Sequence, residues 1–163
     1  MNDSMVKDFQ NRIVNASRAE LLLINYEMLF ATLDQAIEGI DEGNSTLFNK
    51  AMTKSSRLLR ELSDNLDFQY EISKELMALY IFVNKQFIDA TLSMDKEPLI
   101  SGRRLLDNIY KGWVEAKQQD DKSSKDKSTV IANGQKVYAG LTYGKGNLNE
   151  VVYGNEQQRG FKA

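Results

Sequence analysis

The feature that most constrains this chain is the near absence of helix-breaking residues before residue 120. Its only proline is Pro98, and Leu, Ala, Lys and Glu are common throughout this region. Proline removes a backbone donor and clashes inside a helix, whereas these other residues lose little on entering one. The sequence therefore predicts long helices, with Pro98 in the first turn of one of them, where its missing amide is not needed.

Local signals indicate where these helices begin and end. Ser17-Arg18-Ala19-Glu20 has the spacing of a capping box, Gly43 can adopt the left-handed conformation that ends a helix, and Asn44 or Ser45 can cap the next helix. The predicted helices are a short amphipathic one at residues 3–14 and four long ones at 18–42, about 45–66, 70–94 and 98–119. Four long helices with short connections predict an all-α fold, an antiparallel four-helix bundle.

The composition supports one folded domain and excludes several kinds of chemistry. The chain has 163 residues, of which 42% are hydrophobic, so it can bury a real core. It contains neither cysteine nor histidine. This excludes disulfides, thiolate nucleophiles, histidine-based catalysis and zinc sites with the usual ligands. We expect no enzymatic activity, no catalytic residue, no metal and no cofactor.

Charge and hydropathy patterning bear on partners and location. The 21 basic and 23 acidic side chains give a net charge of −2, which offers no electrostatic reason to expect nucleic-acid binding. The longest apolar run is only Leu79 to Val83, and the opening residues MNDSMVKDFQNR lack a basic-then-apolar leader. We expect a cytoplasmic protein without membrane insertion.

The composition changes after the predicted bundle, residues 1–119. Residues 120–128, DDKSSKDKS, are typical of a solvated linker, and residues 129–163 form an arm rich in glycine and tyrosine. Within the arm, Asn133-Gly134 separates two β-prone stretches, which predicts a β-hairpin. An isolated hairpin is marginal in water, so the arm is otherwise expected to be non-helical and to need a surface for support.

Two of the long helices carry more apolar residues than one core-facing side requires. The core sides are expected to contain Leu22, Tyr26, Leu29, Leu33, Ala36 and Ile40 in the first long helix and Ile72, Leu76, Leu79, Val83, Phe87 and Ala90 in the third. At 100° per residue, further apolar side chains fall on other faces: Leu21, Ile24 and Met28 in the first, and Met77, Ile81 and Ile88 in the third.

Two explanations of these extra apolar faces remain open from the residues alone. The short N-terminal helix and the arm could cover them, or they could bind a partner. Burying six such side chains gives about 10 kcal/mol at ~1.5–3 kcal/mol each, against an association cost of ~4–15 kcal/mol. A stable complex therefore needs a long additional contact.

Other patterns have simpler explanations than a functional site. The acidic strip of Glu20, Glu27, Asp34 and Glu38 is interpreted as a solvated face, because bundle metal sites built on carboxylates also need histidine. The basic strip of Lys50, Lys54, Arg57 and Arg60 is interpreted as salt-bridged surface. The segment GLTYGKG lacks the spacing of a phosphate-binding loop.

The stretch Ala16-Ser17-Arg18-Ala19-Glu20-Leu21-Leu22-Leu23-Ile24-Asn25-Tyr26-Glu27 resembles the signature of the flagellin export chaperones, the FliS family. Leu59-Arg60-Glu61-Leu62, Leu79-Tyr80 and Trp113-Val114-Glu115-Ala116 follow in the family's order, so the resemblance covers about residues 12–118. Arg18, Asn25, Glu27 and Met28 depart from the family pattern, which has proline, leucine, aspartate and a small residue there.

The resemblance implies a cytoplasmic chaperone that binds the disordered C-terminal region of flagellin, prevents premature polymerisation and delivers it to the flagellar export gate. A client that folds on binding would supply the long contact that the energetics require. The implied client contacts are Leu21, Ile24, Met28, Met77, Ile81 and Ile88, and the client-bound chaperone is expected to be a monomer.

An alternative function is a helical adaptor or regulator with another client, masked by its own arm at residues 129–163. Saturable binding of a flagellin C-terminal peptide would separate the two functions.

Overall fold

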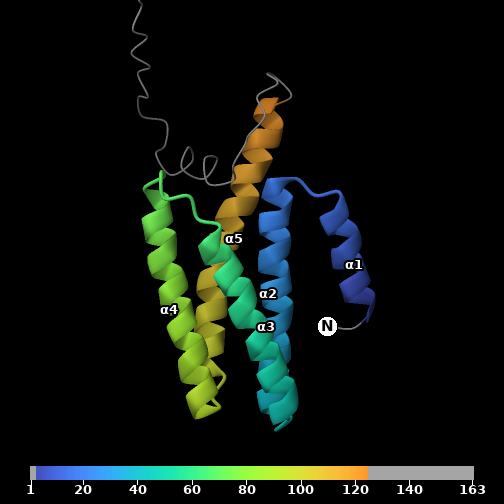
Figure 1. Ribbon diagram of the computed structural model, residues 1–163, viewed down its shortest axis with the longest axis vertical. Coiled ribbons are helices and arrows are strands. Elements are labelled where there is room, and N and C mark those ends of the chain that lie inside the picture. Colours follow the sequence, from blue (N-terminus) through green and yellow to red (C-terminus); the bar gives the residue numbers. More distant parts are fainter. Residues whose placement is uncertain (1–2, 125–163) are drawn as a thin grey trace, which may run out of the picture.

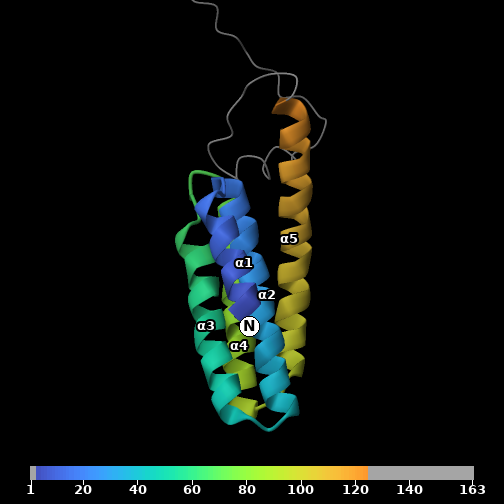
Figure 2. The same cartoon turned by 90° about the vertical axis from the view of Figure 1, so that its right-hand side faces the viewer.

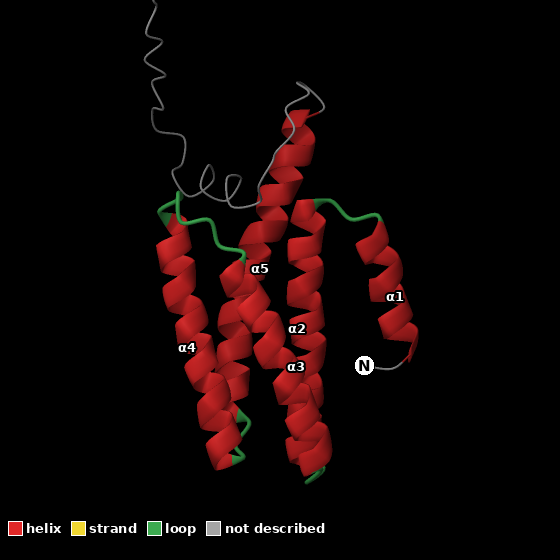
Figure 3. Cartoon of the chain, viewed as in Figure 1, coloured by secondary structure: helices red, strands yellow, loops and turns green. Residues whose placement is uncertain are grey.

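The computed structural model describes residues 3–124 and forms five α-helices over that range. They are α1 (Asp3–Val14), α2 (Arg18–Asp41), α3 (Ser45–Asp64), α4 (Ile72–Ser93) and α5 (Glu97–Ser124). The four long helices run alternately in opposite directions, and α1 lies beside α2 at one edge of the bundle (Figures 1 and 3). The predicted all-α antiparallel bundle is confirmed. The predicted arm at 129–163 and its hairpin lie outside the described residues.

The signals that were predicted to start α2 and to separate it from α3 are present in the structure. The Glu20 amide donates to Ser17 Oγ at 3.3 Å and the Ser17 amide donates to Glu20 Oε2 at 2.8 Å, which completes the capping box. Gly43 follows α2 with φ +65°, and Asn44 Oδ1 accepts a 3.0 Å hydrogen bond from the Leu47 amide at the start of α3. These two satisfied helix ends allow a very short α2–α3 connection.

The ends of the later helices differ from the prediction. The helix predicted to fade near Gln119 continues as α5 to Ser124, through the start of the predicted linker. No glycine or proline stops it there, and Lys117 Nζ lies 3.1 Å from Asp121 Oδ2 one turn on. As a result α5 extends beyond the other helices (Figure 2). At the far end, α4 stops because Met94 adopts a left-handed conformation, with φ 54°.

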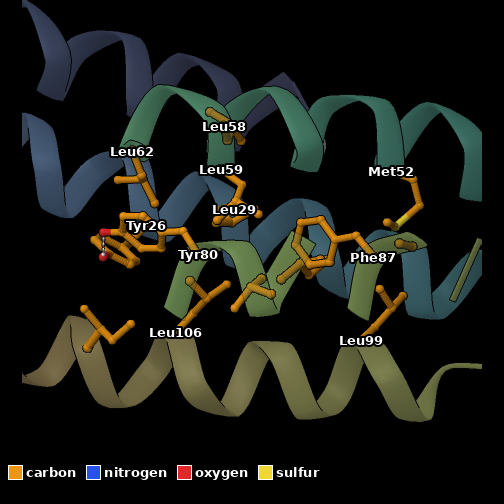
Figure 4. Close-up of a cluster of buried hydrophobic side chains, with 14 of the residues drawn as sticks. Tyr26, Leu29, Met52, Leu58, Leu59, Leu62, Tyr80, Phe87, Leu99 and Leu106 are labelled. Carbon is orange, nitrogen blue, oxygen red and sulfur yellow. Dashed lines mark hydrogen bonds between the residues drawn. The ribbon is translucent and has the colours of Figure 1, made fainter. Parts of the chain in front are cut away.

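The core occupies the length of the bundle between the four long helices (Figure 4). In α2 the predicted core residues Tyr26, Leu29, Leu33 and Ala36 are buried, whereas Leu22 and Ile40 are only partly buried. In α4 Tyr80 is buried, while the predicted Leu79 is only partly buried. The large apolar side chains that are fully buried are Tyr26, Leu29, Leu33, Phe48, Leu76, Tyr80, Val83, Phe87, Leu99 and Leu106.

Small side chains bring α2 and α3 into close contact at the end near their connection. A Cβ on Gly39 would lie 2.7 Å from the backbone nitrogen of Phe48, so only glycine fits there. Further along, the hydroxyl of Ser55 donates to Thr32 Oγ1 at 2.9 Å, and Thr32 Oγ1 donates to the Leu29 carbonyl. Both buried hydroxyls are hydrogen-bonded, so their burial carries little cost.

We predict that Gly39→Ala destabilises the protein by about 1–3 kcal/mol, because the added methyl must displace the α3 backbone and outweighs the gain in helix propensity. The measurement is urea unfolding followed by circular dichroism. Gly102→Ala is the matched control, because its new Cβ would meet Gln86 Cβ at 3.5 Å, an ordinary contact. The control should be neutral or more stable, and equal destabilisation of both variants would contradict the proposed contact.

Candidate functional site

A groove of about 560 Å³ lies between the first half of α2 and the last half of α3. The α2 wall contains Leu21, Ile24, Asn25 and Met28, whose spacing of i, i+3, i+4 and i+7 places them on one side of the helix. The α3 wall contains Leu58 and Leu62, with Arg57 and Glu61 among the other α3 residues that line it, and Leu66 follows just after the helix. The groove is therefore apolar with charged residues around it.

The structure brings the three α2 residues predicted from the sequence into this groove, at different depths. Leu21 is 41% exposed, Met28 is partly buried, and Ile24 is only 3% exposed. Ile24 lies outside the main core cluster, as its spacing predicts, yet it is buried rather than exposed.

Two aromatic residues from the far side of the core form the floor of the groove. Tyr80 of α4 and Trp113 of α5 line it, although both are almost fully buried. The Tyr80 hydroxyl hydrogen-bonds to the Tyr26 hydroxyl at 2.5 Å (Figure 4), and Trp113 Nε1 donates to the Tyr26 hydroxyl at 3.3 Å. The polar atoms under the groove thus bind one another, and sequence reasoning missed Tyr80 because its neighbour Leu79 fits the same helical spacing.

Helix α1 closes one end of the groove and is fastened to α2. Ile13 lines the groove, Phe9 is buried, and Arg12 Nη1 donates to Glu27 Oε2 at 2.5 Å. Glu27 also accepts a 3.0 Å hydrogen bond from the Tyr110 hydroxyl of α5. Partial burial and this carboxylate together raise the pKa of Tyr110, and the hydrogen bond with Glu27 raises the pKa of Arg12. The N-terminal helix therefore covers part of the extra apolar face of α2, which was one of the two explanations that the sequence left open.

A second apolar surface lies on α4, on the other side of the bundle from α1 (Figure 1). We call it the α4 stripe and define it as Ile81, Phe82, Ile88 and Leu92. Their exposed fractions are 63%, 45%, 51% and 81%. The predicted residues Ile81 and Ile88 belong to this surface, whereas Met77 is partly buried against the core. Phe82 and Leu92 were missed, although continuing the spacing of three and four residues would have included Leu92.

Other kinds of site are not seen among residues 3–124. No three acidic residues in this range come together in a way that could hold a metal ion. Within the same range, no helix has the length and apolar character needed to cross a bilayer. The predicted basic strip is partly paired, because Arg57 Nε lies 3.6 Å from Glu61 Oε1.

The buried hydroxyl under the groove predicts a stability change at high pH. Burial raises the pKa of Tyr80 from 10.0 to about 12. Since the folded pKa lies above the unfolded one, this contribution to stability is complete below pH 10 and is lost as the pH rises toward 12. When the pH rises from about 8 to about 11.5, the unfolding free energy of the unmodified chain should fall by about 2 kcal/mol more than that of Tyr80→Phe.

Urea unfolding at both pH values measures this difference, and Tyr70→Phe is the control for removal of one phenol. An equal pH dependence in the unmodified chain and in Tyr80→Phe would contradict the assignment of a buried, protonated Tyr80.

This chain is similar to known proteins over the helices that form the groove and the α4 stripe. The family model "Flagellar protein FliS" matches residues 1–120, which include α1 to α4 and nearly all of α5. The chain is also similar to the flagellar secretion chaperone FliS of Bacillus subtilis (strain 168), with 22% identity over 113 residues, 69% of this chain and 85% of that protein. Both confirm the resemblance found in the sequence. Because the family model covers most of its length, including the groove and the α4 stripe, this chain belongs to the FliS family of flagellar secretion chaperones.

Proposed function

We propose that this chain is a cytoplasmic export chaperone that binds the C-terminal region of flagellin, keeps it from polymerising and delivers it to the flagellar export apparatus. The observation that carries the proposal is the groove between α2 and α3, with apolar walls from both helices and space for side chains of a docked helix. An amphipathic helix presents anchors at i, i+3, i+4 and i+7, the same spacing as the α2 wall. Membership of a non-enzymatic chaperone family supports a binding function.

The α4 stripe is proposed as a second contact of the same client. Its four side chains are each about half exposed or more, so burying them contributes on the order of 5 kcal/mol. Association itself costs ~4–15 kcal/mol, so neither surface is sufficient for a stable complex. A long segment that reaches both sides of the bundle meets this requirement, whereas a short peptide does not.

A disordered client suits this pair of surfaces. A segment that folds on binding can pass around the bundle and place apolar residues first in the groove and then on the α4 stripe. Once both surfaces are covered, the complex exposes no large apolar face among the described residues that would drive self-association. We therefore propose a one-to-one complex, with the chaperone as a monomer, that docks at a component of the export gate.

Calorimetric titration of the full chain with a peptide spanning the C-terminal region of flagellin tests this function. We expect saturable one-to-one binding with a negative heat-capacity change, because apolar surface is buried. Leu21→Asp in the groove and Ile81→Asp on the α4 stripe should each weaken binding by about tenfold or more. Both positions are exposed, so the fold should tolerate the substitutions.

Asn108→Asp, at an exposed position of α5 outside both surfaces, is the matched control and should leave the affinity unchanged. Absence of saturable binding would contradict the proposed function. Binding weakened by Leu21→Asp but not by Ile81→Asp would confine the client to the groove.

A further inference from the structure

One polar atom beside the groove, the side-chain oxygen of Asn25, has no hydrogen-bond partner in the described part of the chain. Asn25 lies in the α2 wall between Leu21 and Met28, on a side of the helix that is apolar apart from Arg18 at the helix start. Its Oδ1 atom is buried from solvent and has no hydrogen-bond partner within residues 3–124. A buried acceptor without a partner is costly, and leucine at this position would avoid that cost.

The other asparagine that lines the groove differs from Asn25, because its carboxamide has a hydrogen-bond partner. Asn65, at the end of α3, also lines the groove, but its Nδ2 donates to the Glu61 carbonyl at 2.7 Å. Under the groove, the hydroxyl groups of Tyr26 and Tyr80 bind each other. Asn25 therefore has an unpaired oxygen beside the groove, and a rotation of its carboxamide toward the groove would bring that oxygen within reach of a group from outside the described chain.

We propose that Asn25 selects the client, by accepting a hydrogen bond from an uncharged polar side chain on the apolar face of the helix that docks in the groove. This inference rests on the proposed function and names the feature of the client that the groove reads. The donor is an uncharged hydroxyl, carboxamide or indole N–H group, so it belongs to serine, threonine, tyrosine, asparagine, glutamine or tryptophan.

The chemistry of the groove favours these uncharged side chains over backbone amides and charged side chains. The backbone amides of a docked helix bind their own carbonyls, so they cannot reach Asn25 Oδ1, except near the helix start. A lysine or arginine would have to bury its charge among Leu21, Ile24 and Met28, which is far more costly than burying a hydroxyl or carboxamide. A polar pair inside an apolar contact also fixes the register of two helices, as buried asparagines do in coiled coils.

The experiment is a double-mutant cycle measured by calorimetry on the full chain. The probe is a peptide spanning the C-terminal region of the flagellin from the same organism. A set of variant peptides replaces each serine, threonine, tyrosine, asparagine, glutamine or tryptophan singly by an apolar residue of similar size. We expect one replacement to weaken binding to the unmodified chain by about tenfold. Against Asn25→Leu, that same replacement should have no effect or should tighten binding.

Asn25→Leu should also unfold at a higher urea concentration than the unmodified chain, which shows that the variant is folded. Asn65→Leu is the matched control, because it adds the same side chain to the groove without removing an unpaired acceptor. In this control the sensitive peptide replacement should keep its full effect.

Three outcomes would overturn the inference. If Asn25→Leu binds the original peptide as tightly as the unmodified chain does, Asn25 makes no contact with the client. If no peptide replacement couples to Asn25, the hydrogen bond comes from the client backbone or does not form. If the unmodified chain does not bind the original peptide at all, the proposed function fails and this inference fails with it, whereas the first two outcomes leave that function intact.

Discussion

The close contact between α2 and α3 at Gly39 and Phe48 is the constraint on which the rest of the structure depends. The missing side chain of Gly39 lets the two backbones meet near their connection, and the hydrogen-bonded pair Thr32 and Ser55 continues this narrow packing. Toward the other end the helices part in Figure 1. The groove opens there, over Tyr80 and Trp113. The groove therefore lies at the end of this helix pair away from the close contact.

The floor of the groove explains how a concave surface coexists with a closed core. Tyr26, Tyr80 and Trp113 come from three different helices and satisfy their polar atoms among themselves. Their large rings occupy the interior of the bundle beneath the groove, where α2 and α3 diverge. Helix α1, held by Phe9 and by the Arg12–Glu27 ion pair, covers one end of the groove, while the α4 stripe has no cover among residues 3–124.

Much of this fold could be predicted because its signals are local. The capping box at Ser17, the turn at Gly43 and Asn44, and the helical spacing of the core residues each depend on neighbours within a few positions. The exposure of individual groove residues could not be predicted, because it depends on the angle between helices. Ile24 has the spacing of a residue outside the core side but is buried, and Tyr80 rather than Leu79 enters the core, where its hydroxyl meets that of Tyr26. The unpaired state of the Asn25 oxygen could not be predicted either, because it depends on which atoms surround that side chain in the folded chain.

Methyl NMR of isoleucine-labelled protein tests the central claim, that one client covers the groove and the α4 stripe together. On adding the flagellin C-terminal peptide, the methyl signals of Ile24, Ile81 and Ile88 should shift and saturate at the same peptide concentration. Those of Ile37 and Ile109, which belong to neither surface, should change little. Shifts confined to isoleucines outside both surfaces, or separate saturation of Ile24 and Ile81, would contradict this account of the chain as a two-surface flagellin chaperone.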